Sequence, residues 1–205
     1  MNFGIDACLT GNKYAYELNT NSIIHQLYTS IPNNYKSKNP IIVDIGEPGN
    51  PIIYYISLIN YLNNNSIQSL FLRQISTNWK NIVVLHMKKM KHLPHVIIME
   101  IFEKDAETFK KKPLSFTVNN ATYKLDSSVV RDTTKQHFCS TVTCENKEYG
   151  YDGASFSRLK KLEWKNRLNS SDFTWKFEGT INNDGIPLEW NYTKCYQLLF
   201  YYRIK

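Results

Sequence analysis

Short runs of apolar residues, each bounded by turn residues, set the strongest limit on how this chain folds from residue 66 onward. The clearest run is Val96 to Ile101, which follows Leu93-Pro94 and is apolar at every position except Glu100. A continuous apolar run of this length is typical of a strand buried on both faces, whereas a half-exposed strand alternates. The sequence therefore predicts a sheet in which at least this strand is covered on both sides.

The other runs predict strands that pair mostly antiparallel through short turns. In chain order, the expected strands are Leu114 to Val118, Tyr123 to Val130, His137 to Cys144, Tyr149 to Tyr151 and Cys195 to Arg203. Asn119-Asn120 suits a hairpin turn between the first two, and Glu145 to Lys147 returns the chain between the third and fourth. Residues 67–75 and 81–87 fit either two strands or a strand with a short helix.

The first 65 residues have a different character. Ser22 to Tyr28 and Ile52 to Leu62 carry apolar residues at helical spacing, Ile41 to Ile45 suits a short strand, and Asn33 to Asn39 reads as a polar linker. We therefore expect an α+β fold with a largely antiparallel sheet, in one domain over residues 1–205. Its parts are a reduced helical part (1–65) and a sheet-rich part (66–205), the latter interrupted by an insertion at 156–190 that the pattern does not place.

One histidine and one aspartate stand where neighbouring strands would bring them together. His137 opens the alternating strand, and Asp152 follows the strand that returns from it. Their separation, 152 minus 137, is 15 residues, enough for one strand, a short turn and the facing strand. A carboxylate beside an imidazole fixes the tautomer and orientation of a general base, which is how cysteine peptidases prepare a thiol. On the other reading, His137 caps an ordinary strand and Asp152 belongs to a turn.

The order of motifs from residue 93 to residue 203 resembles the C-terminal part of the ubiquitin-specific proteases, including divergent relatives carried by viruses and mobile elements. The stretches that carry the resemblance are Leu93 to Ile101, Gln136-His137-Phe138, Tyr149 to Gly153 and Cys195 to Arg203. They cover about half of the chain. Gly153 after Asp152 matches the Tyr-Asp-Gly form of the mobile-element relatives, and Gln136 replaces the glycine that usually precedes the histidine.

The resemblance implies that His137 is the general base and Asp152 its orienting partner, in a fold of fingers and palm. The family's nucleophile box, Gly-Asn-Thr-Cys-Tyr-x-Asn-Ser, is missing: the aligned position holds Leu18. Cys8 is the only cysteine upstream of His137, so it is the candidate nucleophile, or else a small buried hydrophobe. Cys139 lies two residues from His137 on one strand, which aims its thiol poorly, so we expect it to line the core.

The four cysteines have no zinc-type spacing, and no Gly-rich phosphate loop is present, so the sequence predicts neither a metal nor a cofactor. His86, His92 and His95 cluster without a carboxylate or cysteine in ligand spacing, and we interpret them as exposed loop residues. No apolar run approaches the roughly 18 residues that cross a bilayer. We expect an intracellular protein, cytoplasmic or nuclear, with reduced thiols.

Three function classes follow. The first is an inactive relative of the family that binds ubiquitin, a ubiquitin-like modifier or another protein. The second is an active isopeptidase that uses Cys8, His137 and Asp152. The third is a basic nucleic-acid-binding module, suggested by the net charge of +7, which also opposes binding to the basic patch of ubiquitin.

The basic residues themselves are scattered along the sequence. We interpret the lysine clusters 88–91, 110–112 and 160–161 as solvated faces or turns. The tryptophans of the insertion, interleaved with Lys160, Lys161 and Lys165, could stack bases, but packing of the insertion onto the sheet is the favoured interpretation.

Overall fold

A computed structural model describes residues 26, 28–36, 57, 58, 60, 61 and 68–205 of the chain. Its contacts divide the chain into two compact units, Met1–Ser69 and Leu70–Lys205, four residues from the expected change of character at 65/66. In the first unit, Asn33–Tyr35 form the short 3-10 helix η1 within the segment expected to be a linker. The strand expected at 41–45 and most of the two helices expected in this unit lie outside the described residues.

The second unit contains eight strands and two α-helices, which confirms the predicted α+β class with a largely antiparallel sheet. In chain order, the elements are β1 (Ser69–Leu72), α5 (Trp79–Met87), β2 (Val96–Ile101), α6 (Glu103–Thr108), β3 (Ser115–Val118), β4 (Ala121–Arg131), β5 (Phe138–Cys144), β6 (Lys147–Tyr151), β7 (Leu159–Lys161), the 3-10 helix η2 (Lys165–Arg167) and β8 (Gln197–Arg203). Within the described residues, no helix has the length and apolar character that a bilayer crossing requires.

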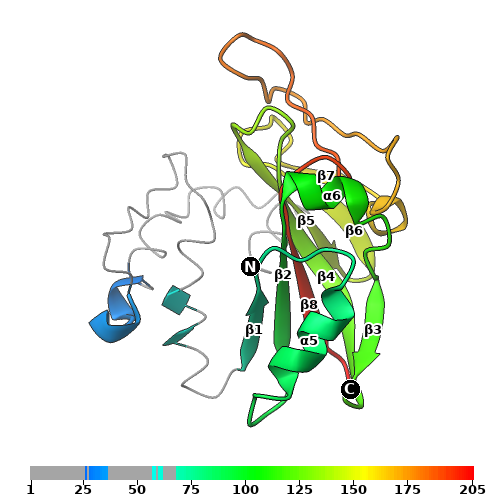
Figure 1. The fold of residues 1–205 in the computed structure, drawn as a ribbon. Helices are drawn as coiled ribbons and strands as arrows, with labels where there is room; N and C mark the ends of the chain where they lie inside the picture. Colours follow the sequence, from blue (N-terminus) through cyan, green and yellow to red (C-terminus); the bar gives the residue numbers. More distant parts are fainter. Residues whose placement is uncertain (1–25, 27, 37–56, 59, 62–67) are drawn as a thin grey trace. The chain divides into compact units, whose positions relative to one another are not determined.

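The strands lie in the order β1-β2-β8-β4-β5-β6-β7, with β3 added to β4 (Figure 1). The C-terminal strand β8 is thus inserted at the centre, antiparallel to both β2 and β4. In β2, every residue after Val96 is buried, so the prediction of a strand covered on both faces is confirmed. Glu100, its one charged residue, is buried as well, and it accepts a hydrogen bond of 2.8 Å from the Tyr196 hydroxyl.

Both predicted hairpins form. Asn119 and Asn120 turn the chain between β3 and β4, and Glu145 and Asn146 turn it between β5 and β6. All four residues have positive φ, between 49° and 62°. Two consecutive left-handed residues match the twist of antiparallel strands, and asparagine tolerates this conformation better than most residues.

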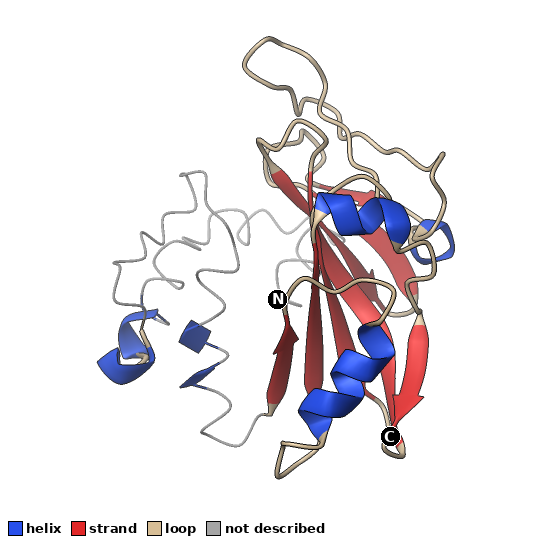
Figure 2. Cartoon of the chain, in the orientation of Figure 1, coloured by secondary structure: helices blue, strands red, loops and turns tan. Residues whose placement is uncertain are grey.

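The ambiguous segment 81–87 is a helix, α5, that lies in front of the sheet in Figure 2. Trp79, Val83 and Met87 are its buried residues, spaced by four, so one side of the helix faces the core. There Trp79 meets Phe116 of β3 edge to face, with ring centroids 4.8 Å apart. The apolar residues of this short segment fit a strand almost as well as a helix, which is why the sequence left both open.

The insertion 156–190 packs onto the sheet through its aromatic residues, as favoured from the sequence. Trp164, Trp175, Phe177 and Trp190 are each at most 4% exposed. Trp175 and Trp164 lie against Tyr192, with ring centroids 5.0 and 5.9 Å apart. Because these rings are buried, they cannot stack bases, and that part of the nucleic-acid hypothesis is wrong.

Candidate functional site

The structure brings His137 and Asp152 together at one end of the sheet. His137 directly precedes β5, and Asp152 directly follows β6, whose last residue, Tyr151, pairs with Ser140. One step further along this ladder, Asp152 stands opposite Cys139, so His137 is its diagonal neighbour on the same face. The His137 Nε2–H donates to the Asp152 Oδ1 over 2.7 Å. Strand pairing alone therefore delivers the contact that the spacing of 15 residues predicts.

Asp152 is fully enclosed, with no exposed side-chain surface. Besides His137, its carboxylate accepts hydrogen bonds from the Thr180 hydroxyl to Oδ2 (2.6 Å) and from the Ala154 amide to Oδ1 (3.0 Å). Burial by itself raises the pKa of Asp152, but the hydrogen bonds from His137, Thr180 and Ala154 more than offset it and hold the pKa below its usual value of 3.8. The carboxylate is thus a fixed negative charge at neutral pH.

His137 keeps one ring nitrogen for a second partner. Since the Asp152 carboxylate can only accept, it fixes the proton of the neutral imidazole on Nε2 and leaves a lone pair on Nδ1. Within the described part of the chain, Nδ1 has no hydrogen-bond partner, and the side chain is 34% exposed. The hydrogen bond to Asp152 raises the pKa of His137 above 6.5 despite the burial of the ring, and the charges of Asp152 and Asp132 act in the same direction. An imidazole in this state can accept a proton and keep it.

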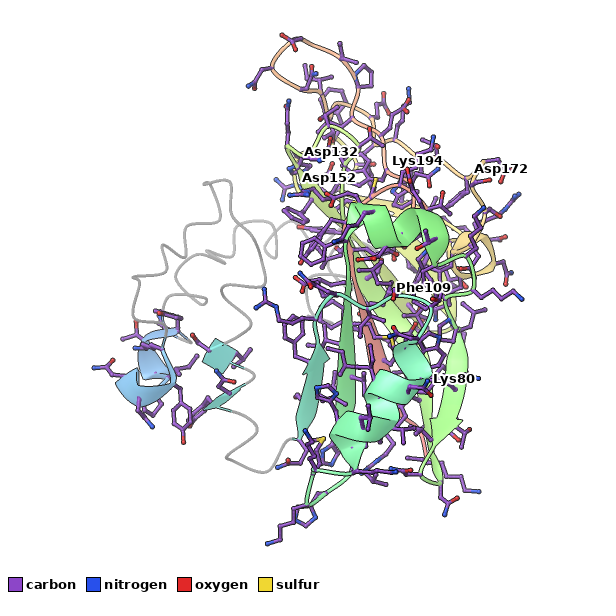
Figure 3. The ribbon with its side chains drawn as sticks, viewed as in Figure 1. Lys80, Phe109, Asp132, Asp152, Asp172 and Lys194 are labelled. Atoms are coloured by element: carbon purple, nitrogen blue, oxygen red, sulfur yellow. The ribbon has the colours of Figure 1, made fainter. Side chains whose placement is uncertain are left out.

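A second buried carboxylate, which the sequence reasoning missed, shapes the loop that presents His137. The Asp132 Oδ1 accepts the amides of Gln136 (2.7 Å) and His137 (2.6 Å), and its Oδ2 accepts the amide of Thr134 (2.6 Å) and the hydroxyl of the same residue. Lys135 takes a left-handed φ of 66° between these contacts. Asp132 and Asp152 lie at the same end of the sheet in Figure 3. An aspartate followed by Thr-Thr is a common signal for a side chain that caps its own turn.

Thr180 and Trp190, both from the insertion, complete the surroundings of the pair. Thr180 is 4% exposed, and its hydroxyl donates to Oδ2 of Asp152, whereas His137 bonds Oδ1. The indole of Trp190 meets the His137 ring edge to face, with centroids 6.2 Å apart. The sequence pattern did not place residues 156–190, so neither contact was foreseeable from spacing.

None of the three described cysteines is placed to act as nucleophile with His137. Cys139 is buried, as expected, and its burial, together with the negative charge of Asp152, raises the pKa of its thiol well above the usual range. Burial also raises the pKa of Cys195, to about 11. Cys144 ends β5 seven residues from His137, roughly 23 Å along an extended strand, on the other face. A thiol that stays protonated or distant cannot attack.

Cys8, the candidate nucleophile of the sequence analysis, lies outside the described residues.

The remainder of the β5 face that carries His137 belongs to the hydrophobic core and not to an active site. Thr141, for example, is fully buried, and its hydroxyl bonds Ser128 (2.8 Å) and Tyr192 (2.7 Å). Across the described residues, no three His, Cys, Asp or Glu side chains converge as a metal site.

Comparisons with known proteins add little to this description. No family model matches the chain, and no curated protein matches it. A solved structure, described as the crystal structure of an essential yeast splicing factor, is similar with a TM-score of 0.40 and 11% identity. The match covers 84% of this chain and 51% of that one, so the chain spans about half of the length of the splicing factor. What defines the site is therefore its own geometry: an oriented histidine–carboxylate pair at one end of an antiparallel sheet.

Proposed function

We propose that this chain is a divergent relative of the ubiquitin-specific proteases that has kept the base and carboxylate of a thiol hydrolase and works without catalysis, by binding ubiquitin or a ubiquitin-like modifier. The observation that carries the proposal is the 2.7 Å hydrogen bond between His137 Nε2 and Asp152 Oδ1, at the ends of two paired strands, which is where the resemblance to the family puts these residues. The Nδ1 of His137, which has no partner among the residues that the structure describes, is then the nitrogen that would face a thiol.

The proposal of an inactive protein rests on the cysteines. Cys139 and Cys195 have raised thiol pKa values, and Cys144 faces away from His137. The family's nucleophile box is missing from the sequence, and contacts that bind a substrate do not replace the covalent step of a thiolate. A site that keeps the orienting network without the nucleophile can still hold the tail of a modifier.

The binding surface beside the pair has an exposed aromatic side chain. Phe156 follows Asp152 by four residues and is 80% exposed. Its amide donates to the Glu178 carbonyl over 3.0 Å, and its ring covers Gly179, next to Thr180. Large exposed aromatic residues are frequent anchors of protein interfaces. We assign Phe156 to the surface that meets the modifier.

A second candidate function, hydrolysis by Cys8 with His137 as base, is favoured by the state of His137 itself. A raised pKa stabilises the imidazolium that pairs with a thiolate. In this case Cys8 would attack the carbonyl at the end of the modifier's Gly-Gly tail, and His137 would pass its proton to the leaving amine.

One set of experiments separates the two candidates. Binding of ubiquitin is measured by NMR titration, and hydrolysis by release of a fluorophore from the C-terminus of ubiquitin, for the wild type and for Cys8→Ala. We expect binding by both proteins and hydrolysis by neither. Hydrolysis that disappears in Cys8→Ala would establish the second candidate in place of the first.

The binding surface has a matched control. Phe156→Ser removes a side chain beside the pair, whereas Leu85→Ser removes one that is 57% exposed on α5. We expect about a tenfold loss of ubiquitin affinity for Phe156→Ser alone, because a truncated interface anchor typically costs more than 1 kcal/mol. Equal affinities of both variants, or no binding by the wild type, would refute the proposed surface.

A further inference from the structure

The end of the second unit that lies away from His137 carries a set of exposed basic side chains, which we call the basic end. It is made of His86, Lys88, Lys89, Lys91, His92 and Lys124, all exposed. The lysines among them form no ion pair within the described residues. In the sequence, Lys88 to Lys91 and Lys124 are more than thirty residues apart, so the cluster exists only in the fold.

Hydrogen bonds tie the lysine-rich loop after α5 to the sheet. The Tyr123 hydroxyl of β4 donates to the Pro94 carbonyl over 2.8 Å. The Arg203 guanidinium of β8 donates to the Leu93 carbonyl over 3.0 Å, and the Arg203 amide to the His95 carbonyl over 2.9 Å. Figure 1 shows this loop, the β3–β4 turn and the end of β8 together at the lower end of the sheet. The basic residues are therefore held on a built surface.

Acidic residues are scarce in the segments that form this end. Residues 70–99, 113–125 and 195–205 contain no Asp or Glu, whereas α6, which lies nearer the other end, carries Glu103, Asp105 and Glu107. Asp126 follows Lys124 by two positions on β4, and both of these charges act on Lys165. The lysines of the loop after α5 thus have no acidic residue near them in the sequence. A surface with one sign of charge and no internal partners attracts a polyanion over a distance.

An exposed aromatic ring stands next to Lys124. Tyr202 of β8 is 41% exposed, and its Cα lies opposite Lys124 on one side and Val96 on the other. An exposed aromatic residue on a sheet, with a lysine beside it, suits an unpaired base that stacks on the ring while its phosphates meet the ammonium groups. An acidic protein or an anionic vesicle would use the charges but not the stacking face.

We propose that the basic end binds single-stranded nucleic acid, with Lys88, Lys89, Lys91 and Lys124 on the phosphates and Tyr202 stacked on a base. This site is separate from the one proposed for a modifier and does not depend on it. It also revises the interpretation of Lys88 to Lys91 as a merely solvated turn, because the fold adds Lys124 and Tyr202 to them.

The test measures fluorescence anisotropy of labelled oligothymidylate and oligouridylate strands against salt concentration, with the full chain. The variant Lys88→Glu, Lys89→Glu, Lys91→Glu is compared with a control of equal charge change, Lys104→Glu, Lys110→Glu, Lys111→Glu, whose lysines are exposed elsewhere. Each phosphate contact contributes about 0.7 to the logarithmic salt slope, so we expect the first variant to lose about 2 of it. The control should retain most of the wild-type slope.

Variants of Tyr202 distinguish a single-stranded nucleic acid from an acidic protein or an anionic vesicle. We expect Tyr202→Ala to weaken binding of the strands about tenfold and Tyr202→Phe to restore it, since the ring and not the hydroxyl stacks. Equal salt slopes for the two lysine variants would overturn the proposal. So would tighter binding to phosphatidylserine vesicles or to polyglutamate than to the strands, or binding that Tyr202→Ala leaves unchanged. Circular dichroism and thermal melting establish that each variant is folded.

Discussion

The charged side chains are buried at one end of the sheet and exposed at the other. At the His137 end, two aspartates are buried, and each carboxylate accepts several hydrogen bonds from its own surroundings. At the basic end, the lysines are exposed and form no ion pair within the described residues. The first arrangement fixes the position of a few atoms, whereas the second creates a field that needs no fixed geometry.

This difference in burial predicts which substitutions each end tolerates. A buried carboxylate that loses its place leaves several donors without an acceptor, so single changes at the His137 end affect both stability and the state of the imidazole. An exposed lysine can be replaced with little effect on folding, and only the sum of several charges matters. The following predictions use this contrast, from the largest effect to the smallest.

Replacement of Asp152 should have the largest effect. Asp152→Ala leaves the His137 Nε2–H, the Thr180 hydroxyl and the Ala154 amide without their acceptor. We expect a loss of about 3 kcal/mol in the free energy of unfolding, measured with urea. The exposed Asp172→Ala is the control, with a change within about 0.5 kcal/mol. Similar values for the two variants would contradict the account.

Asp132→Ala should follow, with a loss of about 2 kcal/mol, because the amides of Thr134, Gln136 and His137 share this carboxylate. Stability alone would not separate a positioning role from a purely structural one. Asp132→Asn keeps the shape but removes the charge, so it should lower the pKa of His137, followed by proton NMR. An unchanged His137 titration would mean that Asp132 only folds the loop.

Thr180→Val should cost about 1 kcal/mol, the usual value for one hydrogen bond, with Thr180→Ser as the conservative control. The lowered pKa of Asp152 stabilises the fold above the unfolded-state value, and this stabilisation is lost as the pH falls through the folded-state value. Without the Thr180 hydroxyl, the Asp152 pKa rises, so acid unfolding should begin at a higher pH. A midpoint equal to that of Thr180→Ser would be inconsistent with this role.

The smallest effect concerns the pH dependence that His137 itself creates. Its pKa is raised in the folded state, so its contribution to stability is fully present below the ordinary value of 6.5 and is lost as the pH rises through the folded-state pKa. His137→Gln should remove this part of the dependence in urea titrations on either side of neutrality. The effect is small because a third of the His137 side chain is exposed. If the free energy of unfolding changes with pH in the same way in the wild type and in His137→Gln, this prediction is wrong.

Much of the sheet could be predicted because its signals are local. Val96 to Ile101 is apolar throughout, and the residues Asn119-Asn120 and Glu145-Asn146 occupy two-residue turns. The contact of His137 with Asp152 follows from the pairing of β5 with β6, which a sequence pattern can express as a spacing.

The rest depends on contacts between segments that have no fixed spacing. Thr180 reaches Asp152 from the irregular part of the insertion, after β7, and four aromatic residues of that insertion are buried by tertiary packing that no period reveals. Asp132 carries a local signal, since Asp-Thr-Thr favours a capped turn, but that signal does not reveal that the turn presents His137. The basic end required the fold, because Lys124 and Tyr202 come from strands far from Lys88 in the sequence.

The central claim is that Asp152 holds the His137 imidazole in one tautomer with Nδ1 open to a partner. Long-range proton–nitrogen NMR of the histidine rings tests it directly at a pH where His137 is neutral. The account predicts a protonated Nε2 and an unprotonated Nδ1 in the wild type, and loss of this preference in Asp152→Ala. A proton on Nδ1 in the wild type, or identical spectra for the two proteins, would contradict it.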